Sequence, residues 1–344
     1  MKKILLFTVC FLLSFAAFSQ EKYFRPVQIN FGFPLSTTNV KKAKEYTNAF
    51  SINLLVGISK NERSLALAGV GNVISNNATG LQIAGVSNYI GNTGNGIAVA
   101  GVTNINKGAY NGIQVSGVYN YSGSGNGIAV AGVTNMSKDS FIGLQLSGVT
   151  NIAGDVKGLQ FAGVANIAKK VKGVQFASIL NVAEESNFPI AFVNIIKNGK
   201  MGVALSYDMM NNTMLSFRSG GKYTYGILGV GYNNLVNDGS KVVAEAGYGI
   251  HIPITDWTEI NNEFKATSVG FSNDKTCFNA SYLLAPSFTF LNHFNVFGGA
   301  NFNYFMSDYV NSNDLIPNKY LWSKDGNYNQ RMYIGYQVGL QYVF

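Results

Sequence analysis

The residue types that most often perform catalysis or bind metals are scarce in this sequence. It contains two histidines, His251 and His293, and two cysteines, Cys10 and Cys277. No pair of them has the spacing of a zinc or thiolate site. The stretch GNTGNG at residues 91–96 resembles a phosphate-binding loop but lacks the lysine of a P-loop, and we interpret it as a turn. We therefore expect no catalytic residues, no metal site and no cofactor.

One group of ionisable residues falls within two C-terminal segments of alternating polarity. Their polar rows contain Glu245, His251, Glu259, Glu263 and Lys265. A Ser–His hydrolytic site could be built from such residues inside a barrel, but no spacing of serine and histidine identifies one. We favour a structural interpretation, in which these side chains pair and hydrogen-bond to fill or line the lumen.

The elements that position these residues are expected to be β-strands. Apolar and polar residues alternate with the period of two that is typical of strands in segments 242–252, 257–267, 278–290 and 294–306. The last segment is the most regular, with an apolar residue at every second position from Met332 to Phe344. Residues from about 200 onward predict eight strands, an even number that can close into a barrel.

The segment from Arg331 to Phe344 resembles the last strand of bacterial outer-membrane β-barrels, which carries alternating apolar residues and a terminal Phe. The resemblance implies that the barrel-assembly machinery recognises this strand and that outer-membrane lipid surrounds the barrel. The long segment 307–330 would then be extracellular, and the short turns near Asp256 and Asn292 would be periplasmic.

An internal repeat of 15 or 16 residues occupies the centre of the sequence. A clear copy is GLQIAGVSN at residues 80–88, and degenerate copies occupy 64–72 and 189–197. A closing asparagine recurs at positions 72, 88, 104, 120, 135, 151, 166 and 181. These GLQIAGVxN-type units, followed by a barrel-like region, resemble a family of signal-bearing surface repeat proteins from Gram-negative bacteria. The resemblance implies a place at the cell surface and no defined activity.

Two architectures are compatible with the repeats. In the first, the repeat strands continue the barrel wall with Leu and Ile towards lipid, and segments 27–33 and 50–58 join them. This predicts an antiparallel transmembrane β-barrel of about 18 strands. In the second, the repeats wind into a β-solenoid with Leu and Ile inside, beside an 8-strand C-terminal barrel. We favour the first, because early copies alternate as a duplicated hairpin would, with Gln82, Ala98, Gln114 and Ala129.

The first twenty residues predict a signal peptide, with Lys2 and Lys3 ahead of an apolar stretch at 4–18. We divide the rest into N-terminal strands of the barrel or a periplasmic segment (21–63), the repeat region (64–198) and the C-terminal barrel region (199–344). Without Lys2 and Lys3, 23 of the 25 basic residues remain against 17 acidic ones. This mild positive charge is spread along the chain and predicts no binding of nucleic acid.

The composition agrees with an exported all-β protein. Only 12% of the residues are charged, against about 25% in an average soluble domain. Apolar runs long enough for a membrane helix are absent beyond the first twenty residues, which argues against a helical membrane protein. We predict a non-enzymatic outer-membrane β-barrel of a Gram-negative bacterium that is a general pore or a structural surface protein. The alternative is a surface-exposed repeat protein for adhesion or partner binding, with segments 34–48 and 307–330 as contact regions.

Overall fold

The computed structural model describes residues 23–32, 35–36, 40–236, 241–270, 277–308, 315–317 and 319–344. Within these ranges the regular elements are β-strands, apart from the 3-10 helix η1 (Val40–Glu45). The predicted all-β class is confirmed. The chain forms two compact units, Met1–Ala162 and Gly163–Phe344. The expected signal peptide lies outside the described residues, as do parts of the segments 34–48 and 307–330.

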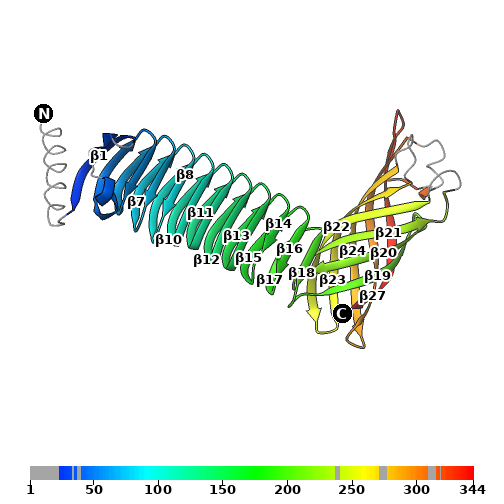
Figure 1. Cartoon of the computed structure of the whole chain (residues 1–344). Coiled ribbons are helices and arrows are strands. Elements are labelled where there is room, and N and C mark those ends of the chain that lie inside the picture. Colours follow the sequence, from blue (N-terminus) through cyan, green and yellow to red (C-terminus); the bar gives the residue numbers. More distant parts are fainter. Residues whose placement is uncertain are drawn as a thin grey trace, which may run out of the picture. The chain divides into compact units, whose positions relative to one another are not determined.

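The first unit is a parallel β-solenoid, coloured blue to green in Figure 1. Each coil contributes two strands joined by a tight corner, and these strands pair in parallel with their counterparts one coil later. The exception is the two-residue strand Leu35–Ser36, which pairs antiparallel with the first strand. The early strands are β1 (Phe24–Gly32), β2 (Leu35–Ser36), β3 (Thr47–Asn53), β4 (Val56–Ser59), β5 (Asn61–Ala68), β6 (Gly71–Ile74), β7 (Ala78–Ala84), β8 (Ser87–Ile90) and β9 (Gly94–Ala100). Later strands run on from one coil into the next: β10 (Thr103–Ser116), β11 (Tyr119–Ala131), β12 (Thr134–Ser147) and β13 (Thr150–Ala162).

The parallel register shows that the expected antiparallel barrel of about 18 strands is wrong. Asn88 pairs with Asn72 on one side and with Asn104 on the other, so equivalent repeat positions lie side by side. The alternative, a solenoid of repeats and a separate eight-stranded barrel, is the architecture present. The N-terminal strands expected in the barrel wall also belong to the solenoid, because Val27 of β1 pairs in parallel with Phe50 of β3.

Successive copies also alternate at the position four residues before Ala98 and Gln114, and there the alternation has a packing cause that needs no hairpin. A Cβ on Gly94 would lie 2.3 Å from the ring of Tyr110, one coil later. A Cβ on Gly125 would lie 2.4 Å from the ring of Phe141 in the same way. Both rings are buried. A coil with an aromatic residue at this place therefore needs a glycine in the preceding coil, and bulky and small turns alternate along a parallel stack.

Small and polar side chains fill the solenoid, and aliphatic side chains cover it. Ala98 and Asn104 are at most 1% exposed, whereas Ile97 is 41% exposed. This is the reverse of the solenoid considered from the sequence, which placed Leu and Ile inside. The amides suit a narrow interior because they bond along the stack: Asn104 Nδ2 donates to Asn120 Oδ1 at 2.9 Å and to the carbonyl oxygen of Val115 at 2.8 Å.

The glycine that opens each repeat is required by the backbone. Gly96 and Gly112 have φ angles of 117° and 129°, in the left-handed region that favours glycine. A Cβ on Gly112 would also lie 2.0 Å from the carbonyl oxygen of Gly96 in the preceding coil. No larger residue fits without displacing one coil from the next.

The second unit begins with coils of the same kind. Equivalent strands again pair in parallel, so Asn166 lies beside Asn181 and Asn181 beside Asn194. The strands are β14 (Ala165–Ile167), β15 (Lys170–Ala177), β16 (Leu180–Ala183), β17 (Glu185–Ile190) and β18 (Val193–Ile196).

The rest of the second unit is a closed antiparallel barrel of eight strands (Figure 1), the strand number expected from residue 200 onward and the barrel of the alternative architecture. Consecutive strands pair, and the first pairs with the last. The wall consists of β19 (Met201–Asp208), β20 (Asn212–Gly220), β21 (Thr224–Asn233), β22 (Val242–Thr255), β23 (Thr258–Val269), β24 (Cys277–Phe290), β25 (Phe294–Ser307) and β27 (Asn329–Val343). The short strand β26 (Trp322–Lys324) pairs with β27 outside the closed ring.

The barrel has a short-turn end and a long-loop end. Turns at residues 221–223, 256–257 and 291–293 lie at the short-turn end. The chain termini of the barrel meet there too, because the Phe344 amide donates to the Met201 carbonyl oxygen. Longer connections after β21, β23 and β25 lie at the opposite end, together with the short turn at residues 209–211 after β19. This asymmetry is typical of outer-membrane barrels, whose periplasmic turns are short.

Candidate functional site

Strands β22 and β23 carry the ionisable residues predicted from the sequence into the barrel interior. Alternate residues of each strand point inward, and the side chains on this row are at most 6% exposed: Glu245, His251, Glu259, Glu263 and Lys265. Five ionisable groups inside one small barrel must be paired, because an isolated buried charge is strongly unfavourable.

The central ion pair joins β20 to β23. Arg218 Nη1 lies 2.9 Å from Glu263 Oε1, and both side chains are at most 2% exposed. The Tyr225 hydroxyl donates to the same carboxylate at 2.8 Å. The guanidinium carbon of Arg218 also lies 4.2 Å from the centre of the Phe297 ring. The pair is therefore buried from solvent, and the Tyr225 hydroxyl and the face of the Phe297 ring hold it in place.

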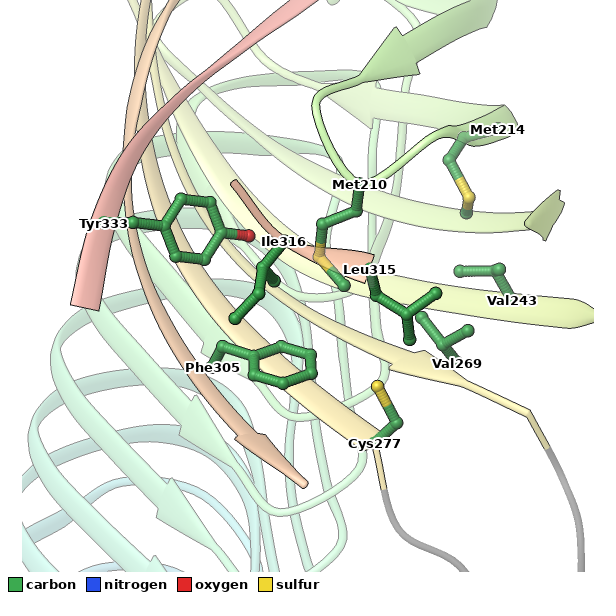
Figure 2. Packing of buried hydrophobic residues seen from close by; sticks show 9 residues of the cluster. All are labelled: Met210, Met214, Val243, Val269, Cys277, Phe305, Leu315, Ile316 and Tyr333. Atoms are coloured by element: carbon green, nitrogen blue, oxygen red, sulfur yellow. The ribbon is translucent and has the colours of Figure 1, made fainter. Parts of the chain in front are cut away.

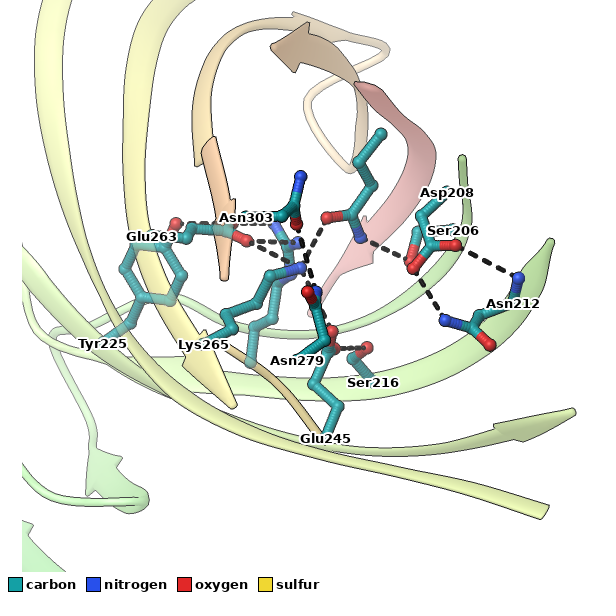
Figure 3. Close-up of polar contacts among 12 residues, drawn as sticks. Ser206, Asp208, Asn212, Ser216, Tyr225, Glu245, Glu263, Lys265, Asn279 and Asn303 are labelled. Carbon is teal, nitrogen blue, oxygen red and sulfur yellow. Dashed lines mark hydrogen bonds and ion pairs between the residues drawn. The ribbon is translucent and has the colours of Figure 1, made fainter. Parts of the chain in front are cut away.

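Lys265 extends this network across the lumen (Figure 3). Its Nζ lies 3.1 Å from Glu245 Oε2 and 3.6 Å from Glu263 Oε2, and it donates to Gln337 of β27. Ser216 donates to Glu245 at 2.7 Å. With Arg218, the network holds two cations and two carboxylates and is formally neutral. Contacts between β20, β22, β23 and β27 fill the cross-section.

A second polar group lies nearer the short-turn end. His251 Nδ1 is 2.9 Å from Asn261 Oδ1 and 3.3 Å from Glu259 Oε1, and the ring stacks on Tyr225 at 4.1 Å between centres. Lys200 Nζ donates to Glu259 at 2.7 Å. The polar partners of the imidazole are thus an amide and a carboxylate, the contacts of a structural histidine, not those of a Ser–His pair.

An apolar cluster closes the interior at the long-loop end (Figure 2). Leu315 and Ile316, from the connection between β25 and β27, are at most 6% exposed against side chains of the wall. The cluster consists of Met210, Met214, Val243, Val269, Cys277, Phe305, Leu315, Ile316 and Tyr333. The one cysteine outside the expected leader is thus a packing residue.

The other ionisable residues considered from the sequence lie elsewhere. His293 is exposed in the turn between β24 and β25, with Nδ1 2.9 Å from the Val343 carbonyl oxygen. Lys170 pairs with Glu185 at 2.8 Å in exposed turns of the coils, far from any enclosed site. Sequence reasoning missed Arg218 and Tyr225. The available signal for Arg218 was the alternation of Ser216 and Arg218 with apolar residues in β20.

The last coil of the second unit packs on the outer wall of the barrel at the short-turn end. The Asn194 amide donates to Ser219 Oγ of β20 at 2.9 Å, and Thr224 Oγ1 of β21 donates to the Pro189 carbonyl oxygen at 2.7 Å. Phe192 stacks on Tyr248 of β22 with ring centres 5.0 Å apart. This coil therefore covers part of the outward face of three barrel strands.

Comparison with known proteins adds no functional assignment. No family model, curated protein or solved structure matches the chain. In the described ranges, no three His, Cys, Asp or Glu residues are grouped closely enough to hold a metal ion. The helices among the described residues include none that is long and apolar enough to cross a membrane.

Proposed function

We propose that this protein is a non-enzymatic outer-membrane protein in which a sealed eight-stranded barrel anchors a repeat solenoid. The observation that carries the proposal is the combination of an apolar outer wall with a filled lumen. The outward rows of three adjacent strands expose Leu205 on β19, Leu215 on β20, and Ile334 and Val338 on β27, each about half accessible. A soluble barrel of this size would place such rows inside.

Aromatic residues at the short-turn end support a membrane boundary there. Trp257 stacks on Phe288, and Phe294 contacts both Phe290 and Tyr342. Trp and Tyr gather at the level of the lipid headgroups in membrane proteins, because their rings have an apolar body and a polar group. These side chains form the band expected where the barrel wall leaves the hydrocarbon.

The filled interior favours a structural role over a general pore. The Arg218–Glu263 pair and Lys265 occupy the centre, and Leu315 and Ile316 close the long-loop end. A water-filled channel needs a barrel of more strands, since eight strands enclose only enough space for side chains. The chain would therefore act as a membrane anchor assembled through its C-terminal strand, Arg331 to Phe344.

The docking of the last coil supports a periplasmic place for the coils of the second unit. Asn194 and Pro189 bond to β20 and β21 at the short-turn end. In outer-membrane barrels this end faces the periplasm. The resemblance to surface repeat proteins implied the cell surface, whereas this contact favours a place for these coils on the inner side of the membrane.

Conductance tests the sealed barrel. The full-length protein, folded into a planar lipid bilayer, is expected to give no stable single-channel steps, because charged and apolar side chains fill the lumen. Insertion is checked in the same preparation by the heat-dependent electrophoretic shift typical of folded barrels. A steady conductance from inserted protein would instead favour a pore.

A further inference from the structure

The charged residues of the repeat region lie on one edge of the solenoid. All eleven of them between residues 64 and 198 follow the closing asparagine of a repeat by three to six positions: Lys107, Lys138, Asp139, Asp155, Lys157, Lys169, Lys170, Lys172, Glu184, Glu185 and Lys197. Those positions lie where the chain passes from one coil to the next, either inside the long strands β10, β12 and β13 or around the starts of β15 and β17 and the end of β18. We call this side the charged edge.

The opposite edge of each coil is apolar. It is formed by the tight corner between the two strands of a coil, and we call it the corner edge. Its residues in the first unit are 38–43% exposed: Val70, Val86, Val102, Val118, Val133 and Val149. The same position in the second unit holds Val164, Ile179 and Phe192.

Apolar side chains continue from the corner edge onto both outer faces of the coil. In the coil around Val102, Ile97 lies on one face and Ile105 on the other. The exposed residues Ile83 and Ile113 continue the first face in the neighbouring coils. Soluble monomers seldom expose contiguous apolar surface of this extent. The corner edge is a ridge that is apolar on both sides. A fluid medium can contact both sides of such a ridge, whereas a partner with one flat face would contact only part of it.

The corner edge is continuous with the outer wall of the barrel in the second unit. Phe192, its last residue, stacks on Tyr248 of β22. Tyr248 belongs to the outward row that continues in Ile250 and Ile252, both about half exposed. This contact lies at the end of the wall where Trp257 and Phe288 stack. The same apolar medium that covers the barrel wall is therefore next to the corner edge.

We propose that the corner edge of the coils in the second unit is embedded in a phospholipid surface, with acyl chains as its occupant and the charged edge of these coils in water. The proposal rests on the proposed function, in which lipid covers the barrel wall. Burial of a continuous apolar ridge at the headgroup boundary is how amphipathic elements lie on membranes without crossing them.

Tryptophan quenching by lipid tests this placement in the full-length protein. In a Trp257→Phe/Trp322→Phe background, Ile179→Trp places the probe on the corner edge and Lys172→Trp places it on the charged edge. A Trp322→Phe variant keeps Trp257 as the reporter of barrel insertion. Each variant is folded into vesicles of phosphatidylcholine with brominated acyl chains. We also include Val164→Trp, a second corner-edge position in the same unit as the barrel, which serves if the Ile179 variant does not fold.

The expected result is that the corner-edge tryptophans are quenched at least about half as strongly as Trp257, and Lys172→Trp hardly at all. Strong quenching of Trp257 with none at Ile179→Trp or Val164→Trp would overturn the inference and leave the barrel anchor intact. Absence of quenching at Trp257 would overturn the proposed function as well. A corner-edge tryptophan shielded from both lipid and aqueous iodide, in a protein of doubled mass, would identify a second copy as the occupant and also overturn it.

Discussion

Arg218 and Glu263 show how charge is accommodated in the barrel at the scale of single residues. Their contact of 2.9 Å is removed from solvent and completed by Tyr225. A buried pair of this kind contributes modestly as a pair, but the loss of one partner leaves an uncompensated charge in a low-dielectric interior. The network therefore specifies one arrangement of side chains across the lumen.

Replacement of one partner is expected to be far more damaging than replacement of both. Arg218→Met should lower the free energy of unfolding by about 3–5 kcal/mol, and Arg218→Met/Glu263→Gln by less than the sum of the two single changes. Urea unfolding of the detergent-folded protein measures both. Lys197→Met, in an exposed pair with Glu184, is the control and should leave the midpoint unchanged. Strict additivity of the two barrel substitutions would argue against a direct pair.

Glu62 gives the first coils a dependence on pH. Its carboxylate accepts hydrogen bonds from Asn48 at 2.9 Å and Ser51 at 2.7 Å. Burial nevertheless raises the pKa of Glu62 from 4.5 to about 7, although these bonds favour the ionised form. Because the folded pKa is the higher one, the contribution of Glu62 to stability is full below pH 4.5 and is lost as pH rises through 7.

Hydrogen exchange of residues 47–68 should therefore show weaker protection at pH 8 than at pH 4, after correction for intrinsic rates. The pKa shift of Glu62 corresponds to about 3 kcal/mol. Glu62→Gln should remove most of the difference, since the amide cannot ionise. Exchange in residues 103–131 is the internal reference. An unchanged pH dependence in Glu62→Gln would show that another group is responsible.

At the scale of elements, the asparagine ladder holds the coils in register. Asn120 Nδ2 donates to the Val130 carbonyl oxygen at 2.7 Å and to Asn135 Oδ1 at 2.9 Å, and its own Oδ1 accepts from Asn104. Loss of this side chain leaves buried polar groups on both neighbouring coils without their partner. Such groups cost about 1–3 kcal/mol each.

Asn120→Ala is expected to reduce amide protection in β10, β11 and β12 by roughly tenfold or more, because 1.4 kcal/mol corresponds to a factor of ten. Asn126→Ala, at an exposed position of the same strand, is the matched control and should change little. Hydrogen exchange with mass spectrometry measures amide protection in both variants. Equal effects at the two positions would contradict a stabilising ladder.

The sequence allowed the strands to be predicted more reliably than their partners. Alternation in 242–252 and 294–306 placed β22 and β25 to within a few residues, because a half-buried strand requires a period of two. The same period is satisfied by a hairpin and by a parallel coil, so the repeats alone did not decide between them. The contact of the Tyr110 ring with Gly94 joins two successive coils, and neither segment alone indicates that this contact forms.

The candidate site was predictable only in part for a similar reason. The polar row of β23 identified Glu263 as inward-facing, since its neighbours in the row are also polar. Its partner Arg218 lies 45 residues away along the chain. Which two residues meet across a closed lumen depends on strand register and barrel curvature, and a single sequence carries little information on either.

At the scale of the whole molecule, the barrel is sealed, and the coils of the second unit are held at one of its ends. In the proposed function, the filled lumen opposes transport and lipid covers the apolar wall. The bonds from Asn194 and Pro189 to the wall fix the coils of the second unit at the short-turn end. The orientation of the barrel in the membrane therefore decides on which side these coils work.

Cysteine accessibility in intact Gram-negative cells tests this arrangement most directly. In a Cys277→Ser background, Ser323→Cys places a thiol at the long-loop end and Lys172→Cys places one on the coils, both at exposed positions. We predict that a membrane-impermeant maleimide labels Ser323→Cys in intact cells and labels Lys172→Cys only after the outer membrane is permeabilised. Labelling of Lys172→Cys in intact cells, with Ser323→Cys protected until permeabilisation, would contradict the proposed orientation. Equal labelling of both in intact cells would contradict a barrel that spans the membrane.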